Sequence, residues 1–155
     1  MAELQTTYAT TLASGYAGMI ANGERGNRIT RTNEDSAGIG FGLPVYRGSG
    51  DHGCTATVGT LATFLGWTIA TSAQGYTATA DADEYAQYDN VAILTSGAIY
   101  VAVKGAVTDG AALTVGTGGG AADLVGATAA DATHIATGWI ADETVTDGLC
   151  RIVKR

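Results

Sequence analysis

Gly48–Gly53 is the segment whose spacing comes nearest to a site for chemistry, because GSGDHG fits the pattern G-x-G-x-x-G. In a dinucleotide-binding unit this pattern follows a buried strand and opens a helix that receives the pyrophosphate. Here the next residues are CTATVGT, which are β-branched and interrupted by glycine. They predict a strand, and no βαβ pattern occurs elsewhere in the chain. We therefore interpret GSGDHG as a glycine-rich turn and not as a nucleotide site.

Possible metal ligands are few and are poorly spaced. The two histidines and two cysteines are His52, His134, Cys54 and Cys150, and Asp51 stands beside His52. Structural zinc sites show paired short spacings such as C-x₂-C, which this chain lacks. We predict an exposed loop histidine, a buried cysteine, and no metal or other cofactor. Two free thiols and a single Cys54–Cys150 bridge both fit the sequence.

Catalytic patterns are also missing from the sequence. There is no G-x-S-x-G elbow for a nucleophilic serine. The acidic run DADE at Asp81–Glu84 lacks the D-x-[DN]-x-[DN]-G spacing of a calcium loop. We predict that the protein is not an enzyme.

The aromatic residues suggest a second class of function. Trp67 and Trp139 lie within apolar segments, so we expect both in the core. Together with the tyrosines they also invite a sugar-binding interpretation, because aromatic rings offer flat apolar faces with polar edges. A glycan-binding β module therefore stays as the alternative function. The tyrosines concerned are Tyr76, Tyr85, Tyr88 and Tyr100.

Composition indicates a turn-rich β protein. Glycine makes up 23 of 155 residues, roughly twice its usual share of about 7%. Short β-branched runs alternate with turn residues, which predicts seven to nine strands. The fold class predicted is all-β, a jelly-roll or barrel-like sandwich of short antiparallel strands. The strands expected are 45–47, 55–57, 60–71 with a bulge at Gly66, a weak one at 76–80, a hairpin over 91–103 turning at 95–97, 111–115, 124–125, 134–140 and 149–153, with one helical turn at 81–88.

The chain divides where its character changes, at Pro44. Residues 1–43 are polar with scattered apolar residues and no strand periodicity, which predicts an extended arm that needs a surface to become ordered. Residues 44–155 form the predicted β domain. GSGDHG then acts as the hinge between the arm and this domain.

Charge is distributed unevenly. Between Asp51 and Asp147 there are eleven acidic residues and one basic residue, Lys104, so this body carries −10. An acidic body repels phosphates and argues against nucleic-acid binding. The uncharged run from His52 to Ala80 is rich in threonine and has too short an apolar centre to span a membrane. The first residues lack a signal-peptide pattern, which indicates synthesis and use in a reducing cytoplasm.

Several segments, in this order, resemble the structural cement (head decoration) proteins of tailed bacteriophages. They are GYAGMIANGE, NRITRTNE, GIGFGLPVYRGSGDHG, FLGWTIA, YDNVAILTSGAIYVAV and VTDGAALTV. The resemblance covers nearly the whole chain and is sharpest up to Ala70. It implies a β-barrel body on the outside of an HK97-like shell, made in the host bacterium and bridging neighbouring capsomers after the shell expands. The implied partners are the major capsid protein and further copies of this chain, with a dimer favoured and a trimer as the alternative.

On this basis the arm supplies the residues expected to bind the capsid. Its four arginines are candidates for pairing with shell carboxylates, since arginine suits bidentate pairing. Ordering of the arm on its own barrel is the competing role for the same arginines. The expected contact residues are Arg25, Arg28, Arg31 and Arg47, with Tyr16, Met19, Ile29 and Phe41 as apolar anchors.

Overall fold

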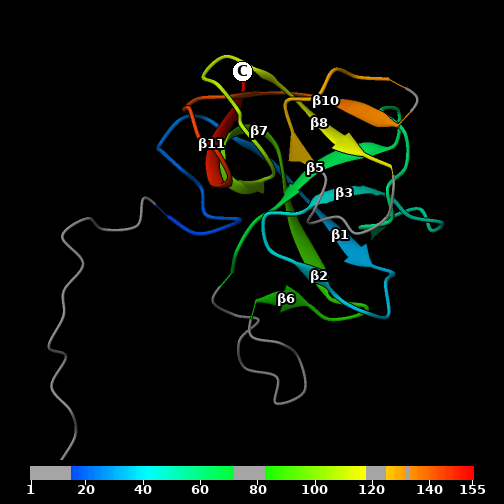
Figure 1. Cartoon of the computed structure of the whole chain (residues 1–155). Coiled ribbons are helices and arrows are strands. Elements are labelled where there is room, and N and C mark those ends of the chain that lie inside the picture. Colours follow the sequence, from blue (N-terminus) through cyan, green and yellow to red (C-terminus); the bar gives the residue numbers. More distant parts are fainter. Residues whose placement is uncertain (1–14, 72–82, 118–124, 132) are drawn as a thin grey trace, which may run out of the picture.

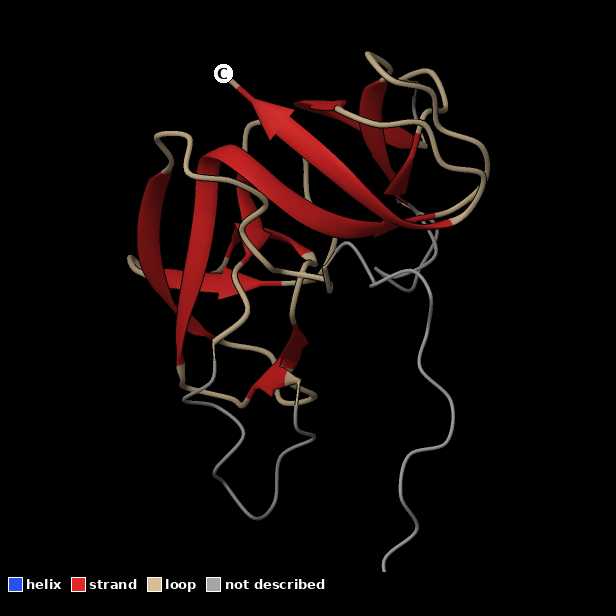
Figure 2. Ribbon diagram, turned by 90° about the vertical axis from the view of Figure 1, so that its left-hand side faces the viewer, coloured by secondary structure: helices blue, strands red, loops and turns tan. Residues whose placement is uncertain are grey.

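The computed structural model describes residues 15–71, 83–117, 125–131 and 133–155. All regular secondary structure in these ranges is β-strand, so the predicted all-β fold class is confirmed (Figure 2). Within the same ranges no helix is long and apolar enough to cross a membrane. The expected weak strand at 76–80 lies outside the described residues.

Five strands close into a barrel. They follow one another around it in the order β1 (Asn27–Asn33), β4 (Gly53–Thr55), β3 (Pro44–Arg47), β5 (Phe64–Thr68) and β7 (Asn90–Val103). The ring closes because β1 also pairs with β7, with Ile29 opposite Ile93. The β1–β4 pair is parallel, and the other neighbours are antiparallel. The barrel is therefore mixed rather than purely antiparallel.

The C-terminal half of β7 belongs to a second sheet. Its order is β7, β11 (Gly148–Lys154), β10 (His134–Ala141), β8 (Ala112–Gly116) and β9 (Val125–Gly126). Figure 1 labels β7, β8, β10 and β11 in its upper part. Beyond the end of β7, the Lys104 amide donates to the Val125 carbonyl at 2.7 Å and draws β9 towards β7. A two-stranded sheet of β2 (Ile39–Gly40) and β6 (Glu84–Tyr85) lies beside the barrel, low in Figure 1.

The apolar core has two parts on the two faces of β7. One includes Ile93 and Tyr85 and belongs to the barrel. The larger one lies between β5, β7 and the second sheet and is centred on Trp67 and Trp139, whose rings meet edge to face at a centroid distance of 6.3 Å. Both indoles are fully buried, as the sequence predicted. Edge-to-face pairs of this kind stabilise a core by about 1 kcal/mol beyond burial of their area.

The prediction that strands begin only at Pro44 is wrong. Asn27–Asn33 is a seven-residue strand of the barrel. Before it, residues around Gly18 bond to the edge of β7, since the Gly18 amide donates to the Tyr100 carbonyl and the Ala21 amide to that of Ala98. β1 and the residues before it show little apolar periodicity, because backbone pairing with β7 fixes their conformation and burial of their own side chains contributes less.

The expected hairpin over 91–103 is also wrong, because β7 runs through it as one strand of 14 residues. The residues interpreted as a turn, Thr95–Gly97, lie where β7 passes from the barrel to the second sheet. Gly97 has a φ of 121°, and a Cβ there would lie 3.0 Å from the Gly26 Cα. The glycine thus permits a close approach of two backbones and not a reversal of the chain.

The helical turn expected at 81–88 is not found in its described part. Residues 83–88 instead contain β6 and a turn, while residues 81 and 82 lie outside the described residues. Tyr85 is fully buried, and its hydroxyl donates to the Ile69 carbonyl. Tertiary packing of one aromatic side chain therefore overrides a local pattern that favours a helix. The other expected strands agree with the observed ones to within a few residues.

Gly66 allows a test of the close approach between β5 and β7 in the barrel. The β3–β5 register shifts at Val45/Tyr46, opposite Gly66, as the predicted bulge requires. Gly66 has a φ of 152°, and a Cβ there would stand 2.1 Å from the Leu94 carbonyl oxygen. We expect Gly66→Ala to lower the free energy of unfolding in urea by about 2–4 kcal/mol, because strain and overpacking combine.

The matched control is Gly110→Ala. Gly110 also has a positive φ, but a Cβ there meets nothing within 4 Å, so we expect a loss of only about 1 kcal/mol. Equal losses for the two variants would contradict the close approach at Gly66.

Candidate functional site

The four candidate arginines do not gather in one place. Arg28 and Arg31 are three residues apart on β1, so their side chains leave opposite faces of the strand. Arg31 is half-buried and lies opposite the buried Val91, whereas Arg28 is exposed. Arg25 precedes β1, and Arg47 ends β3, and both are exposed. No ion pair joins Arg25, Arg28 or Arg47 to the described part of the chain.

The four candidate apolar anchors divide into two kinds. Ile29 and Phe41 pack against the barrel core, and Phe41 meets Tyr85 edge to face at 5.3 Å. Met19 is half-buried, and its backbone pairs with Tyr100. Tyr16 alone is largely exposed, at 61%. Ile29 and Phe41 therefore stabilise the chain's own barrel, while Tyr16 is free for an external contact.

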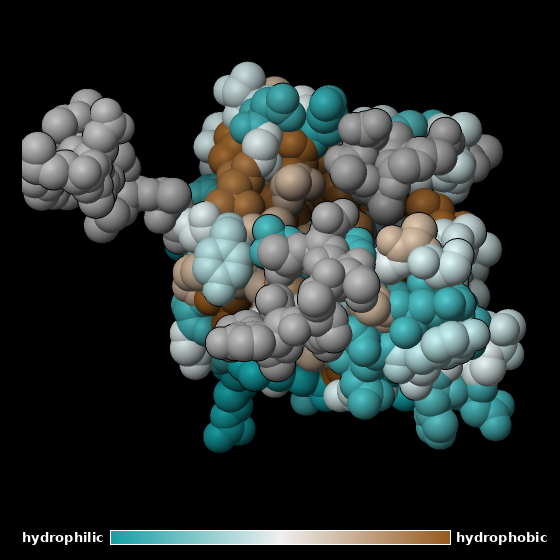
Figure 3. Space-filling view, turned by 90° about the horizontal axis from the view of Figure 1, so that it is seen from below, coloured by the Kyte–Doolittle hydropathy of each residue, from teal (hydrophilic) through white to brown (hydrophobic). Residues whose placement is uncertain are grey.

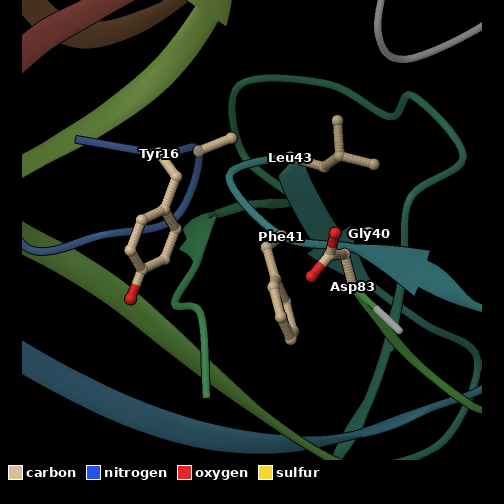
Figure 4. A pocket seen from close by; sticks show the side chains of 6 residues that line it. Tyr16, Gly40, Phe41, Leu43 and Asp83 are labelled. Carbon is tan, nitrogen blue, oxygen red and sulfur yellow. The ribbon is translucent and has the colours of Figure 1, made fainter. Parts of the chain in front are cut away.

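Tyr16 and Phe41 border a shallow, mainly apolar pocket of about 330 Å³. In Figure 4 their rings extend in the same direction from two separate segments, and Leu43, Gly40 and Asp83 complete the wall. Seen from below, apolar side chains reach the surface in patches between hydrophilic ones (Figure 3). Asp83 is the one charged group among the described residues of the lining.

The GSGDHG segment is the loop of the β3–β4 hairpin and not a hinge, since Arg47 pairs with Cys54 across it. Its amides do hold an anionic group, but that group belongs to the chain. The Glu34 carboxylate accepts from the amides of Ser49 and Gly50, each at 2.8 Å, and from the Ser49 hydroxyl at 2.9 Å. These donors lower the pKa of Glu34 below its ordinary value of 4.5. Sequence reasoning missed Glu34, because no local pattern links it to a loop fifteen residues away.

The candidate metal ligands are separated. Cys54 is buried in the barrel, Cys150 in the larger core, and Asp51 and His52 are exposed on the hairpin loop. Both cysteines are free, which decides the question of a bridge that the sequence left open. Burial raises the pKa of each thiol to about 11, so neither is a ready nucleophile. Across the described ranges no three His, Cys, Asp or Glu side chains form a group that could hold a metal ion.

The second histidine makes a local contact only. His134 Nδ1 lies 3.1 Å from Asp131 Oδ1, and the Thr133 hydroxyl and amide donate to the same oxygen. Hydrogen bonds from Thr133 lower the pKa of Asp131 to about 2. Among the described residues, neither a cysteine nor a serine bonds to this pair. The arrangement orders a turn before β10.

The aromatic candidates for sugar binding do not form a platform. Tyr85 and Tyr100 are buried, and of the described tyrosines in that group only Tyr88 is exposed. Tyr76 lies outside the described residues. A sugar ring needs an exposed aromatic face with convergent polar groups, and the buried tyrosines supply none.

Comparison with known proteins explains why the described surface shows no catalytic arrangement. Residues 4–154 match the family model described as "Structural cement protein (E217 gp24/Pam3 gp6)". The chain belongs to this family. It is therefore a phage structural cement protein, a non-enzymatic component of the capsid. The resemblance noted in the sequence is confirmed.

A solved structure shares the fold. It is titled "The capsid of Myoviridae Phage XM1", and one of its chains matches with a TM-score of 0.72 at 12% sequence identity. The match covers 99% of this chain and 97% of that one. No curated protein matches.

The Glu34 carboxylate gives a pH prediction. Its pKa is lowered in the folded cement protein, so its contribution to stability is present above the unfolded pKa near 4.5 and is lost as pH falls through the folded value. We expect the side-chain carboxyl carbon of Glu34 to titrate below pH 4.5 by NMR in the native protein and near 4.5 in urea. A native midpoint at or above 4.5 would contradict the loop geometry.

Proposed function

We propose that this cement protein binds the outer surface of an HK97-like head and bridges neighbouring capsomers, which stabilises the expanded shell. Membership of the cement family is the observation that carries the proposal. The major capsid protein is then its main partner. The barrel and the second sheet share β7 and the larger part of the core, so they form one packed body that can contact two neighbours at once.

The exposed members of the candidate set are the proposed shell contacts. Arg25, Arg28 and Arg47 reach solvent without an ion pair to the described residues, and Tyr16 exposes most of its ring. Solvent-exposed arginine pairs stabilise a complex by only about 0–1 kcal/mol each. Such pairs stabilise a complex more strongly when water is excluded from them. An oligomer that binds several capsomers at once also gains overall affinity, because its second and later contacts form at a high effective concentration.

Residues 1–43 keep a partner-binding role in this proposal, but they are not a detachable arm throughout. Because β1 closes the barrel, contact with the shell falls to the exposed side chains of this segment and to residues 1–14, which lie outside the described residues. The protein also assembles with itself, as a dimer in preference to a trimer. Deletion of residues 1–43 would open the barrel, so point substitutions are the better test.

The test uses purified full-length protein and expanded, undecorated heads. We expect the protein to co-sediment with the heads and to raise the temperature at which they rupture. The double variant Arg25→Gln, Arg28→Gln should bind at least about tenfold more weakly, since two cationic contacts repeated in each oligomer are lost.

The matched control places the same change in net charge elsewhere. Thr108→Glu with Ala112→Glu adds two negative charges on exposed residues of the second sheet and its approach, and we expect it to bind heads as the wild type does. Absence of wild-type binding to both expanded heads and proheads would overturn the proposed function. Equal weakening by both double variants would assign the effect to net charge alone.

A further inference from the structure

Asn22 is the one asparagine in the sequence that is followed by glycine. It begins a loop, residues 22–26, in which every residue is exposed and which ends where β1 starts. The backbone is held to β7 on both sides of this loop, through the amides of Ala21 and Asn27. The loop is therefore fixed at its ends and open to water along its length.

The Asn22 side chain folds over the residues that follow it. Its Oδ1 accepts from the Glu24 amide at 3.1 Å, which is a local side-chain-to-backbone turn. The amide nitrogen of the intervening Gly23 is the atom that can close a ring with Cγ of Asn22. The Gly23 amide donates to no described group, so hydroxide in the solvent has access to its proton.

Gly23 removes the steric barrier to this ring closure, because a glycine backbone rotates more freely than that of any other residue. The fold itself makes no demand for glycine here. A Cβ at this position would meet nothing within 4 Å, and Gly23 is not among the glycines with a positive φ. The chemical effect of Gly23 can therefore be separated from its effect on the structure.

We propose that Asn22–Gly23 is a self-modifying site, at which the asparagine is converted to aspartate and isoaspartate as the protein ages. Asparagine is one of the thermolabile residues of proteins. In the first step hydroxide removes the Gly23 amide proton, and the nitrogen forms a bond to Asn22 Cγ. Negative charge then develops on Oδ1, the atom to which the Glu24 amide already donates, and a donor placed in advance at such an atom lowers the barrier.

In the second step the bond between Cγ and Nδ2 of Asn22 breaks. The departing nitrogen takes a proton from water and leaves as ammonia, which regenerates the hydroxide. Water then opens the succinimide ring at either of its two carbonyls, so the product is an aspartyl or an isoaspartyl residue. No oxidant, reductant or cofactor takes part.

The other asparagines provide an internal comparison. Asn33 makes the same kind of turn, because its Oδ1 accepts from the Asp35 amide at 2.8 Å. It is fully buried, however, and its side-chain nitrogen donates to the Tyr85 carbonyl at 3.0 Å, which retains the leaving group. Asn27 and Asn90 each begin a strand, and neither is followed by glycine. We expect these three asparagines to be stable.

The product changes the charge of the loop. A neutral amide becomes a carboxylate beside Glu24, which pairs with Arg155 at 3.2 Å, and beside the exposed Arg25. The isoaspartyl form also lengthens the main chain by a methylene between the two points at which β7 holds it. The reaction needs no partner, so it is independent of the proposed function.

The experiment follows the full-length protein by peptide mass spectrometry during incubation in mildly acidic and mildly alkaline buffers. We expect Asn22 to gain the mass that separates a hydroxyl from an amino group, while the other asparagines keep theirs. The rate should rise about tenfold per pH unit, because the deprotonated fraction of the amide does so below its pKa. Conversion of Asn33 at the same rate, or a rate that does not rise with pH, would overturn the proposal.

Gly23→Ala is the matched variant. We expect its conversion of Asn22 to be at least about tenfold slower, because an intramolecular attack depends on close approach of the reacting atoms. Its melting midpoint should equal or exceed that of the wild type, since the added Cβ meets nothing in the fold and restricts the unfolded chain. An unchanged rate in this variant would contradict attack by the Gly23 nitrogen.

A further measurement separates the contribution of the fold from that of the dipeptide alone. We expect Asn22 in the native protein to react at no less than about a tenth of its rate in guanidinium chloride at the same pH, because the loop is exposed and the turn keeps the reacting atoms together. A native rate below that limit would show that the fold protects Asn22, and would overturn the proposal.

Discussion

The structure depends on one strand that serves two sheets. The first half of β7 closes the barrel with β1 and β5, and from Gly97 onward it pairs with β11. Its two faces bury different side chains, so both parts of the core rest on it. The contact between Trp67 and Trp139 then joins β5 of the barrel to β10 of the second sheet. A slip of β7 by one residue would exchange its two faces and expose both cores, which makes its register the most tightly specified feature of the fold.

That constraint explains what the sequence reveals and what it leaves out. Burial of Trp67 and Trp139, the bulge at Gly66 and most strands can be predicted, because each leaves a local pattern of apolar, β-branched or glycine residues. The strand nature of Asn27–Asn33 cannot, because only Ile29 in it is a large apolar residue and its partner lies some sixty residues away. Gly97 looks like a turn residue for a related reason: the sequence shows a glycine but not the Gly26 backbone that passes beside it.

The candidate contact residues show the same difference between what local sequence predicts and what depends on contacts distant in sequence. The expected shell contacts were chosen by residue type, and four of the eight are exposed: Arg25, Arg28, Arg47 and Tyr16. Exposure itself could not be predicted for Ile29 and Phe41, since they pack on residues distant in sequence. The sequence also does not reveal the unusual backbone conformation of Tyr88, whose φ is 69°. Its type is ordinary, and only its backbone conformation, which depends on the fully buried Asn33, distinguishes it from the other tyrosines.

Low sequence identity to a chain of the same fold bears on where specificity lies. The XM1 capsid chain keeps the fold at 12% identity, which a barrel tolerates because its core needs apolar residues of suitable volume and not particular ones. Contacts with a shell are less tolerant, since a desolvated charge or an inserted ring needs a matching partner. Contact residues therefore cannot be carried over from a relative so distant. They must be found from the exposed side chains of this chain itself.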